Sequence, residues 1–393
     1  MKSLLSASAV LALLAGTAQA EVKLGVLLGF TGPLESVAGP IASAAEMAIA
    51  EVSDSGKLLD GETVAPVRGD STCIDASAAT AAGERLVTSD GVAGIVGAMC
   101  SGATGAVLAN VAIPNGVVMI SPSATSPGLT TVEDNGLFFR TAPSDARQSV
   151  VMADILTERG LSEVAVTYTN NDYGKGLADS FGTAFEEAGG TVTISAPHDD
   201  GKGDYSAEVG ALAAAGGEAL VVAGYVDEGG SGIIQAALDT GAFDTFILPD
   251  GMVAPALTEN FGDAIDGSFG QLPGSDSEGG GDFETLASAA GFDGAAVYAK
   301  EGYDAAALIL LAMQAAGSAD ASDYKEKIIE VANEPGEKIY PGELAKALEI
   351  LAEGGDIDYV GASDVELIGP GEASGRFREV EIEGGEITTV GYR

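Results

Sequence analysis

The sequence of 393 residues contains no tryptophan, a single histidine and only two cysteines. The histidine, His198, lies in the polar segment APHDDGKGDYS, which is predicted to be an exposed loop. A Ser-His-Asp or Cys-His enzyme would have to use His198 as its base, and nothing around it favours that role. One histidine and two cysteines are also too few for a zinc site, so no metal is expected.

Nucleotide-binding motifs are missing as well. Gly-Lys occurs at 56, 174 and 201, but never within the phosphate-binding pattern G-x-x-x-x-G-K-[ST], and no G-x-G-x-x-G follows a predicted strand. The acidic loop DDGKGD lacks the alternating oxygen ligands and terminal Glu of a calcium loop. No cofactor is therefore predicted.

Basic residues are scarce, since 18 Lys and Arg stand against 59 Asp and Glu, a formal net charge of −41. The acidic residues are spread along the chain, so the surface is expected to repel nucleic acid and anionic lipid. Attraction of a cationic ligand is an alternative, but diffuse charge is more typical of a solvated surface. The charge therefore says little about the ligand.

A signal-like apolar run occurs only at the N-terminus. Residues 1–20, MKSLLSASAVLALLAGTAQA, combine Lys2, an apolar stretch and an A-x-A sequence, which predicts a cleaved secretory signal peptide. No cysteine lies near the predicted cut, so no lipid anchor is expected, and the periplasm of a Gram-negative bacterium fits best. The run DAAALILLAMQAAG at 304–317 is too short to cross a membrane and predicts a buried helix.

The two cysteines, Cys73 and Cys100, are expected to form a disulfide in an oxidising compartment, with a stabilisation of about 3 kcal/mol. The segment GAMCSGATG at 97–105 also sets the Cys100 thiol beside the Ser101 hydroxyl. A nucleophile at one of these two positions therefore remains an alternative at this point.

Strand and helix patterns alternate with little interruption after residue 20. A first set runs from EVKLGVLLGF to VVMISPS, and a second from a helix at 145–160 to TFILPDG. Strict alternation predicts parallel sheets covered by helices on both faces, and two sets predict two such α/β domains. Junctions are expected near 140–145 and at 270–282, helical stretches return at 283–355, and the chain ends in a hairpin that turns at Gly384-Gly385.

Polar and aromatic residues follow several of the predicted strands. They are Ser101, Ser123, Thr125, Tyr173, Tyr225 and Asp250. In open parallel sheets, ligands bind at the carboxyl ends of the strands. Each residue also has an ordinary explanation as a turn or packing residue, but their recurrence at successive strand ends favours a binding site.

Besides the Cys73/Cys100 pair, the chain contains the segments VKLGVLLGFTGPLES, AMCSGAT, MISPSATSPGLT, FFRTAPSD, NDYGKGLA, GDYSAEV, AGYVDE, LPDG and GYDAAALIL. In this order, these segments resemble the Leu/Ile/Val-binding protein family, the type I periplasmic receptors of ABC amino-acid importers. The resemblance covers nearly all of the chain after residue 20. It implies two doubly wound parallel-sheet α/β lobes joined by three hinge crossings, with the ligand closed between them. The N-terminal lobe would comprise 21–141 and 274–374, and the C-terminal lobe 142–273 and 375–393.

The resemblance also implies where the ligand carboxylate binds. It would meet Ser101, Ser123, Ala124 and Thr125, together with amides at helix N-termini. Oriented N–H groups and hydroxyls hold a carboxylate without an arginine, which suits a chain with few cations.

The ligand ammonium group would meet residues of the other lobe, by the same resemblance. Asp250 and Tyr225 would receive it, while Tyr173 and Tyr303 would flank the ligand. The family usually carries Glu at the position of Asp250, so the acid here is one methylene shorter.

The side-chain pocket would be lined by Met99 and Val37, and Val37 stands where the family often has a larger aromatic residue. These departures leave the ligand open between a branched-chain amino acid, another neutral amino acid and a related small carboxylate.

The expected function is capture of this ligand by a monomer, without any chemical reaction, and delivery to an ABC permease in the inner membrane. A sensory receptor of the same fold is the alternative. A secreted serine hydrolase is a less favoured one.

Overall fold

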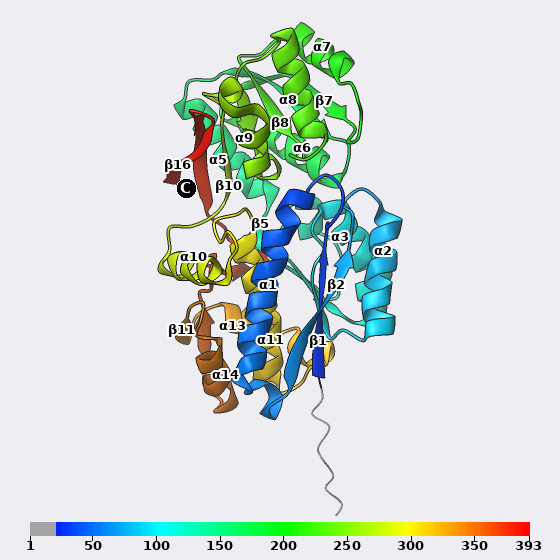
Figure 1. The fold of residues 1–393 in the computed structure, drawn as a ribbon, viewed down its shortest axis with the longest axis vertical. Coiled ribbons are helices and arrows are strands. Elements are labelled where there is room, and N and C mark those ends of the chain that lie inside the picture. The colour runs from blue at the N-terminus through cyan, green and yellow to red at the C-terminus, as the bar shows by residue number, and fades with distance from the viewer. Residues whose placement is uncertain (1–20) are drawn as a thin grey trace, which may run out of the picture.

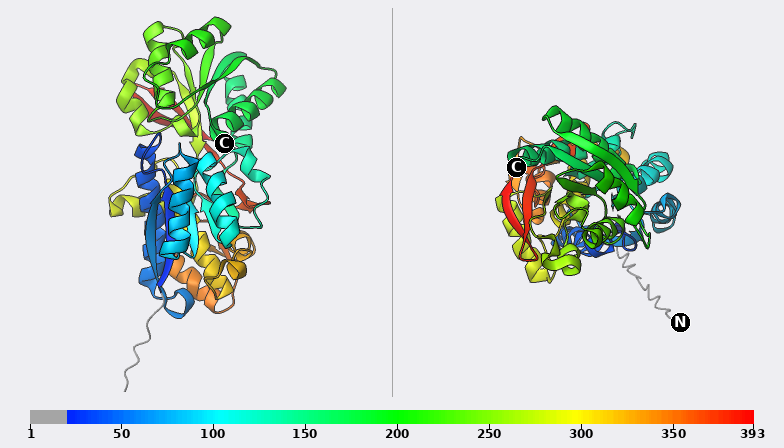
Figure 2. Two further views of the ribbon diagram at one scale, coloured as in Figure 1. Left: turned by 90° about the vertical axis from the view of Figure 1, so that its right-hand side faces the viewer. Right: turned by 90° about the horizontal axis from the view of Figure 1, so that it is seen from above.

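A computed structural model describes residues 21–393, so the predicted signal peptide at 1–20 lies outside the described residues. Figure 1 shows two lobes stacked along the long axis of the molecule, each built around its own sheet. The turned views in Figure 2 show that the molecule is much longer than it is wide. Within 21–393, no helix is long and apolar enough to span a membrane.

The first lobe is built on a seven-stranded sheet with the order β13-β14-β5-β4-β3-β1-β2. Its strands are β1 (Glu21–Leu28), β2 (Thr63–Asp70), β3 (Gly94–Gly97), β4 (Val118–Ser121), β5 (Phe138–Pro143), β13 (Leu367–Ile368) and β14 (Glu372–Ala373). All neighbouring strands are parallel except the edge pair β13 and β14. Parallel pairing places the carboxyl ends of β1 to β5 at one edge of the sheet, which faces the second lobe.

Helices cover both faces of the first sheet. They are α1 (Glu35–Ser55), α2 (Ala76–Glu84), α3 (Ser101–Val107), α4 (Ile113–Asn115), α10 (Glu278–Ala290), α11 (Ala299–Ala316), α12 (Ala321–Tyr324), α13 (Lys327–Ala332) and α14 (Leu344–Ala352). A small parallel sheet of β11 (Glu337–Ile339) and β12 (Ile357–Tyr359) belongs to the same lobe. In β1, Leu24 and Val26 belong to the core that includes α1 and α11, whereas Leu27 belongs to the core beneath α2 and α3. This two-residue period is what a strand buried on both faces requires.

The second lobe is built on a sheet with the order β16-β15-β10-β9-β8-β6-β7. Its strands are β6 (Glu163–Thr169), β7 (Thr191–His198), β8 (Ala219–Ala223), β9 (Phe246–Leu248), β10 (Phe269–Pro273), β15 (Phe377–Glu383) and β16 (Glu386–Tyr392). Its helices are α5 (Asp145–Glu158), α6 (Asp172–Glu187), α7 (Ser206–Ala215), α8 (Gly229–Thr240) and α9 (Pro255–Phe261). The predicted C-terminal hairpin is confirmed as β15 and β16, which add an antiparallel edge to this sheet.

The chain passes between the two sheets three times, after β5, after β10 and after β14, as the two-lobed fold class predicted. The third crossing touches the other two. Gly375 has a φ of 69°, and a Cβ there would lie 2.1 Å from the Pro143 side chain. The amide of Gly274 donates to the carbonyl of Arg376 at 3.0 Å. The lobe boundaries predicted at 141/142, 273/274 and 374/375 remain a proposal, which these crossings support.

Two segments predicted as junctions are regular structure. FFRTAP forms β5, a fully buried strand of the first sheet, and only Ser144 separates it from α5. The Gly-rich segment at 270–282 contains most of β10 and the start of α10. The Ser277 hydroxyl accepts from the amide of Gly280 and so caps α10, a local effect that outweighs the low helix propensity of glycine.

The prediction that His198 is exposed is wrong. It ends β7, is 2% exposed, and its Nδ1 lies 2.8 Å from Thr167 Oγ1. Its neighbours in sequence are polar because the chain leaves the sheet directly after it. Burial lowers the pKa of His198 to about 4, so the ring is neutral near neutral pH.

Candidate ligand-binding site

The candidate site lies between the lobes, at the edge of each sheet where its central strands end. The first lobe contributes Leu34, Met99, Cys100, Ser101, Ser123 and Tyr298, and the second contributes Tyr173, Tyr225, Asp250 and Gly251. The structure thus brings together most of the residues that follow predicted strands. Such convergence is expected of the carboxyl ends of parallel strands.

The predicted disulfide is confirmed, because Cys73 and Cys100 are bonded. Cys100 is the residue directly before α3, so the bond ties the segment after β2 to the start of that helix. Its sulfur is therefore not a free thiol. The Ser101 hydroxyl, the other candidate nucleophile, accepts from the amide of Ser126 at 3.1 Å, and the histidine ring lies in the second lobe beside Thr167.

Hydroxyl groups and helix amides form the first-lobe side of the site. Ser101 is the first residue of α3, where backbone N–H groups have no partner within the helix. Ser123 Oγ donates to the carbonyl of Met99 at 2.9 Å. The Thr125 hydroxyl is buried and has no hydrogen-bond partner among residues 21–393. It does not line the cavity itself but lies on the same loop.

The loop that carries these hydroxyls is held from behind by the buried side chain of Arg140. Its guanidinium donates to the carbonyls of Ala124, at 3.1 Å, and Ser126, at 2.9 Å, and also to Glu372 and Thr130. The amide of Ala124 is engaged too, by Ser121 Oγ at 2.9 Å. Both backbone groups of Ala124 thus shape the loop.

The second-lobe side of the site is acidic. Asp250 follows β9 and is 2% exposed. Its Oδ1 accepts from the Tyr173 hydroxyl at 2.7 Å, and its Oδ2 accepts from the Tyr298 hydroxyl, which comes from the first lobe. Burial, reinforced by the Asp250 carboxylate, raises the pKa of Tyr173 and of Tyr298 well above the usual range, so both stay neutral donors. The Tyr225 ring stacks on Tyr173 with centroids 5.2 Å apart.

A second buried acid, Asp145, lies near this site and was missed by sequence reasoning. It begins α5, is fully buried, and neither of its carboxylate oxygens has a hydrogen-bond partner among the described residues. Burial, and then the charge of Asp250, raises its pKa well above the usual range. The nearby Thr125 hydroxyl has a smaller, opposite effect and lowers the pKa of Asp145. The Thr125 hydroxyl and the Asp145 carboxyl group are close, but they do not form a regular hydrogen bond.

Two predicted residues lie elsewhere. Tyr303 is buried inside the first lobe, where its hydroxyl donates to Glu51 and accepts from the amide of Gly342. The tyrosine at the site is Tyr298, which precedes α11 with a φ of 63° and directs its ring toward Asp250. An aromatic residue directly before a helix is the only sequence signal for it.

Val37 also lies outside the lining of the cavity. It is buried in the first-lobe core on α1, whereas Leu34, which precedes that helix, lines the cavity. Leu34 and Val37 are three residues apart in the sequence, so they lie close together on one side of the helix. Where the helix begins therefore determines which of the two reaches the cavity.

The lobes are in contact around the site. On one side, the amide of Asp227 donates to the Pro33 carbonyl at 3.2 Å, and Asp227 Oδ2 accepts from the amide of Ser36 at 2.9 Å. On another, Ser126 Oγ donates to the Asp172 carbonyl at 3.0 Å. The remaining cavity has a volume of about 20 Å³, room for a water-sized group. A larger ligand therefore needs the lobes or the tyrosines to move apart.

Within 21–393, no group of three or more His, Cys, Asp or Glu side chains is arranged to hold a metal ion.

Two α/β lobes with a closed site at the facing ends of their strands define a two-lobed solute-binding protein. A family model described as periplasmic binding protein matches residues 21–336. Leu/Ile/Val-binding protein homolog 3 of Brucella melitensis is 34% identical over 219 residues, which cover 55% of this chain and 58% of that protein. Leu/Ile/Val-binding protein homolog 1 of Brucella abortus is 33% identical over 280 residues, 69% of this chain and 73% of that protein.

Solved structures show the same fold. A leucine-binding protein, LivK, from Thermotoga maritima superposes with a TM-score of 0.80 at 24% identity, covering 94% of this chain and 98% of that one. A solute-binding protein of an ABC transporter from R. palustris, in complex with benzoate, gives a TM-score of 0.76 at 18% identity, covering 95% and 96%. The chain belongs to the periplasmic binding protein family, among the Leu/Ile/Val-binding proteins.

Proposed function

We propose that this protein captures a small amino acid between its lobes for an ABC importer. The observation that best supports the proposal is the chemical asymmetry of the site. Hydroxyls and helix amides line its first-lobe side, and the Asp250 carboxylate lies on its second-lobe side. A zwitterion across the cavity would find a partner for each of its charges.

The ligand carboxylate is assigned to the first lobe. Among the described residues, no basic side chain lines the cavity, so the carboxylate would be held by hydroxyls and amides. Because Ser101 Oγ already accepts from Ser126, its own O–H remains able to donate to the ligand. The buried Thr125 hydroxyl has no hydrogen-bond partner among residues 21–393, and it would gain one if ligand binding brought its loop closer to the cavity. Ser123 lines the cavity, but its hydroxyl donates to the Met99 carbonyl and its amide to Ser121 Oγ, so it would exchange one of these bonds for one to the ligand. Ala124 would act by shaping the loop.

The ligand ammonium is assigned to Asp250, beside Tyr173 and Tyr225. An ionised carboxylate accepts up to about four hydrogen bonds, so Asp250 can keep its tyrosine donors and still accept from an ammonium group. Tyr298 takes the flanking role that the sequence suggested for Tyr303. The side-chain pocket is assigned to Met99 with Leu34 in place of Val37.

A carboxylate ligand without an amino group is the second candidate. It is favoured by the benzoate bound to the R. palustris protein and by the stacked rings of Tyr173 and Tyr225. Asp250 argues for the amino acid, since a buried carboxylate without a cation is unfavourable in such a site.

The proposal includes no catalysis. Cys100 is consumed by the disulfide, and Ser101 has no histidine beside it. The protein is proposed to act as a monomer in the periplasm of a Gram-negative bacterium, after removal of residues 1–20, and to dock on an inner-membrane permease. A sensory role would use the same site, and loss of amino-acid uptake on gene deletion distinguishes transport from sensing.

The decisive experiment is calorimetry on ligand-stripped protein with a panel of neutral amino acids and with benzoate. Asp250→Asn is expected to weaken amino-acid binding at least tenfold, about 1.4 kcal/mol, because it removes the negative partner of the ammonium group.

Asp154→Asn is the matched control, since Asp154 is exposed on α5, and it should leave the affinity unchanged. Amino-acid affinity that survives Asp250→Asn would contradict the assignment. Benzoate binding alone, insensitive to that variant, would favour the second candidate.

A further inference from the structure

Buried polar groups without a partner are concentrated at one place in the molecule. Within residues 21–393, eleven buried side-chain nitrogen and oxygen atoms have no hydrogen-bond partner. Six of these atoms belong to four residues, Thr125, Asp145, Gln148 and Ser149. Because buried polar groups in folded proteins nearly always have a partner, this concentration points to a group that binds near these residues.

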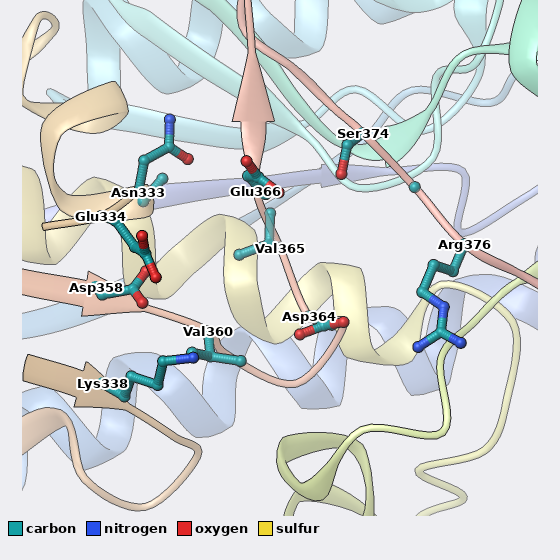
Figure 3. A pocket seen from close by; sticks show the side chains of 12 residues that line it. Asn333, Glu334, Lys338, Asp358, Val360, Asp364, Val365, Glu366, Ser374 and Arg376 are labelled. Atoms are coloured by element: carbon teal, nitrogen blue, oxygen red, sulfur yellow. The ribbon is translucent and has the colours of Figure 1, made fainter.

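A cavity elsewhere in the first lobe has none of these atoms in its wall. It has a volume of about 660 Å³, and Figure 3 shows it between the small sheet of β11 and β12, the loop at 360–366 and the third crossing. Acidic side chains, Lys338 and Arg376 line it together, and in the part of the chain that the structure describes none of them has a buried oxygen atom without a partner. That cavity therefore lacks the feature that marks the groups around Asp145.

The four residues lie together beside the ligand site. Asp145 is the first residue of α5, and Gln148 and Ser149 follow three and four residues later on the same face of this helix. The amide of Asp145 donates to the carbonyl of Thr125 at 2.9 Å. Thr125 belongs to the loop whose Ser123 lines the cavity between the lobes. Asp145 thus lies just behind the lining of the site, at the first crossing.

Charged groups from other elements face the Asp145 carboxyl group. After the larger effect of burial, the charge of Asp250 raises the pKa of Asp145, while Arg140 on β5 has a smaller, opposite effect. Three tyrosines of the site also sense its charge, which adds to the effect of burial in raising their pKa; they are Tyr173 on α6, Tyr225 after β8 and Tyr298 before α11.

Two neighbouring carboxylates in a buried site do not both ionise, so one of them keeps a proton while no cation is present. Asp250 accepts hydrogen bonds from two tyrosine hydroxyls, which stabilise its ionised form. Asp145 accepts none from residues 21–393. Asp145 is therefore the acid that holds the proton in the ligand-free protein.

An ammonium group changes this balance. The proposed function assigns the ligand ammonium to Asp250, and a positive charge there favours ionisation of the carboxyl group beside it. The Gln148 amide and the Ser149 hydroxyl are donors without a partner among the described residues, and they lie on the same helix face as Asp145. They are available to stabilise its ionised form.

We propose that Asp145 is a second carboxylate for the cationic group of the ligand, and that it releases its proton to the solvent when an amino acid binds. This inference rests on the proposed function. It also narrows the ligand class, because only a ligand that carries an amino group displaces the proton.

Calorimetry of the full protein in different buffers measures the proton directly. L-leucine, L-valine and L-alanine are tested, and the tightest binder is titrated near neutral pH in phosphate, MOPS and imidazole, which differ in their enthalpy of ionisation. The slope of the apparent binding enthalpy against the buffer enthalpy gives the protons released per molecule bound. Wild type is expected to release about one proton, and its affinity should rise by up to about tenfold per pH unit in the range where the proton is released.

Asp145→Asn keeps the shape of the side chain and removes the proton that is released. It is expected to bring the proton count close to zero, to abolish the pH dependence of binding and to weaken binding at least fivefold. Two controls should leave the proton count unchanged. Asp154→Asn changes an exposed acid of the same helix, and Glu301→Gln changes a buried acid of the first lobe whose pKa burial raises to about 7. Far-UV circular dichroism confirms that each variant is folded.

The outcomes separate this inference from the proposed function. Amino-acid binding without proton release in wild type would overturn the inference and leave the proposed function intact. Proton release that persists in Asp145→Asn, or that Glu301→Gln abolishes, would overturn it as well, because the proton would come from another group. If none of the three amino acids binds, the proposed function fails and the inference fails with it. The proton count of wild type needs no variant, so the test holds even if Asp145→Asn does not fold.

Discussion

Replacement of Arg140 by lysine tests how the binding loop is held. The Arg140 side chain is 1% exposed and its guanidinium serves four partners, two carbonyls of the loop, the Thr130 hydroxyl and Glu372. A lysine ammonium is not a planar fork and cannot reach all four partners. Hydrogen bonds to charged groups contribute about 1.5–3 kcal/mol each, so losing two of them lowers the free energy of unfolding by about 3 kcal/mol or more.

The assay is urea unfolding followed by far-UV circular dichroism, with the free energy of unfolding taken by linear extrapolation. Arg68→Lys is the matched control, because Arg68 also pairs with a carboxylate, Glu46, but is 51% exposed. Its expected cost is about 1 kcal/mol or less. The reasoning would be refuted if Arg140→Lys cost no more than Arg68→Lys. Since the same loop carries Ser123 and Thr125, amino-acid affinity should fall in Arg140→Lys as well.

Two further predictions concern closure and pH. Tyr298→Phe removes the hydroxyl that joins the first lobe to Asp250, a loss of about 1.5–3 kcal/mol that shifts the closed-to-open ratio of the ligand-free protein roughly tenfold or more. Small-angle scattering should show a larger radius of gyration for Tyr298→Phe than for wild type or for the exposed control Tyr392→Phe. Equal radii would mean that the hydrogen bond between Tyr298 and Asp250 does not hold the lobes together. Burial lowers the pKa of His198 from its ordinary value of 6.5 to about 4. Between these two pH values the unfolded chain therefore carries a proton on His198 that the folded chain does not. Wild type should therefore lose stability as pH falls from about 6.5 to about 4, by about 1.4 kcal/mol per pH unit from this group, and His198→Asn should lack that component. If the free energy of unfolding changed with pH in the same way in wild type and His198→Asn, His198 would not be a buried neutral residue.

Much of the fold follows from local patterns. The period of apolar residues distinguishes strands from helices, and strict alternation of the two predicts parallel sheets in two lobes. The Gly384-Gly385 turn predicts the final hairpin, and two cysteines in a chain that is expected to be exported predict their pairing. Ser101, Tyr225 and Asp250 each follow a predicted strand. They can be expected in the same region because parallel strands end at the same edge of a sheet.

The tertiary structure alone decided which residues complete the site. Tyr298 and Tyr303 are the same residue type and lie five residues apart in the sequence. Tyr298 precedes α11 and reaches Asp250, whereas Tyr303 faces the core of the first lobe. Asp145 and Arg140 flank the first crossing, and their burial depends on contacts with residues far away in sequence. Sequence patterns therefore determined the strands, helices and lobes of this protein, because those depend on neighbours along the chain. The partners of its buried charges depend on how two lobes meet, and only the folded chain brings those groups together.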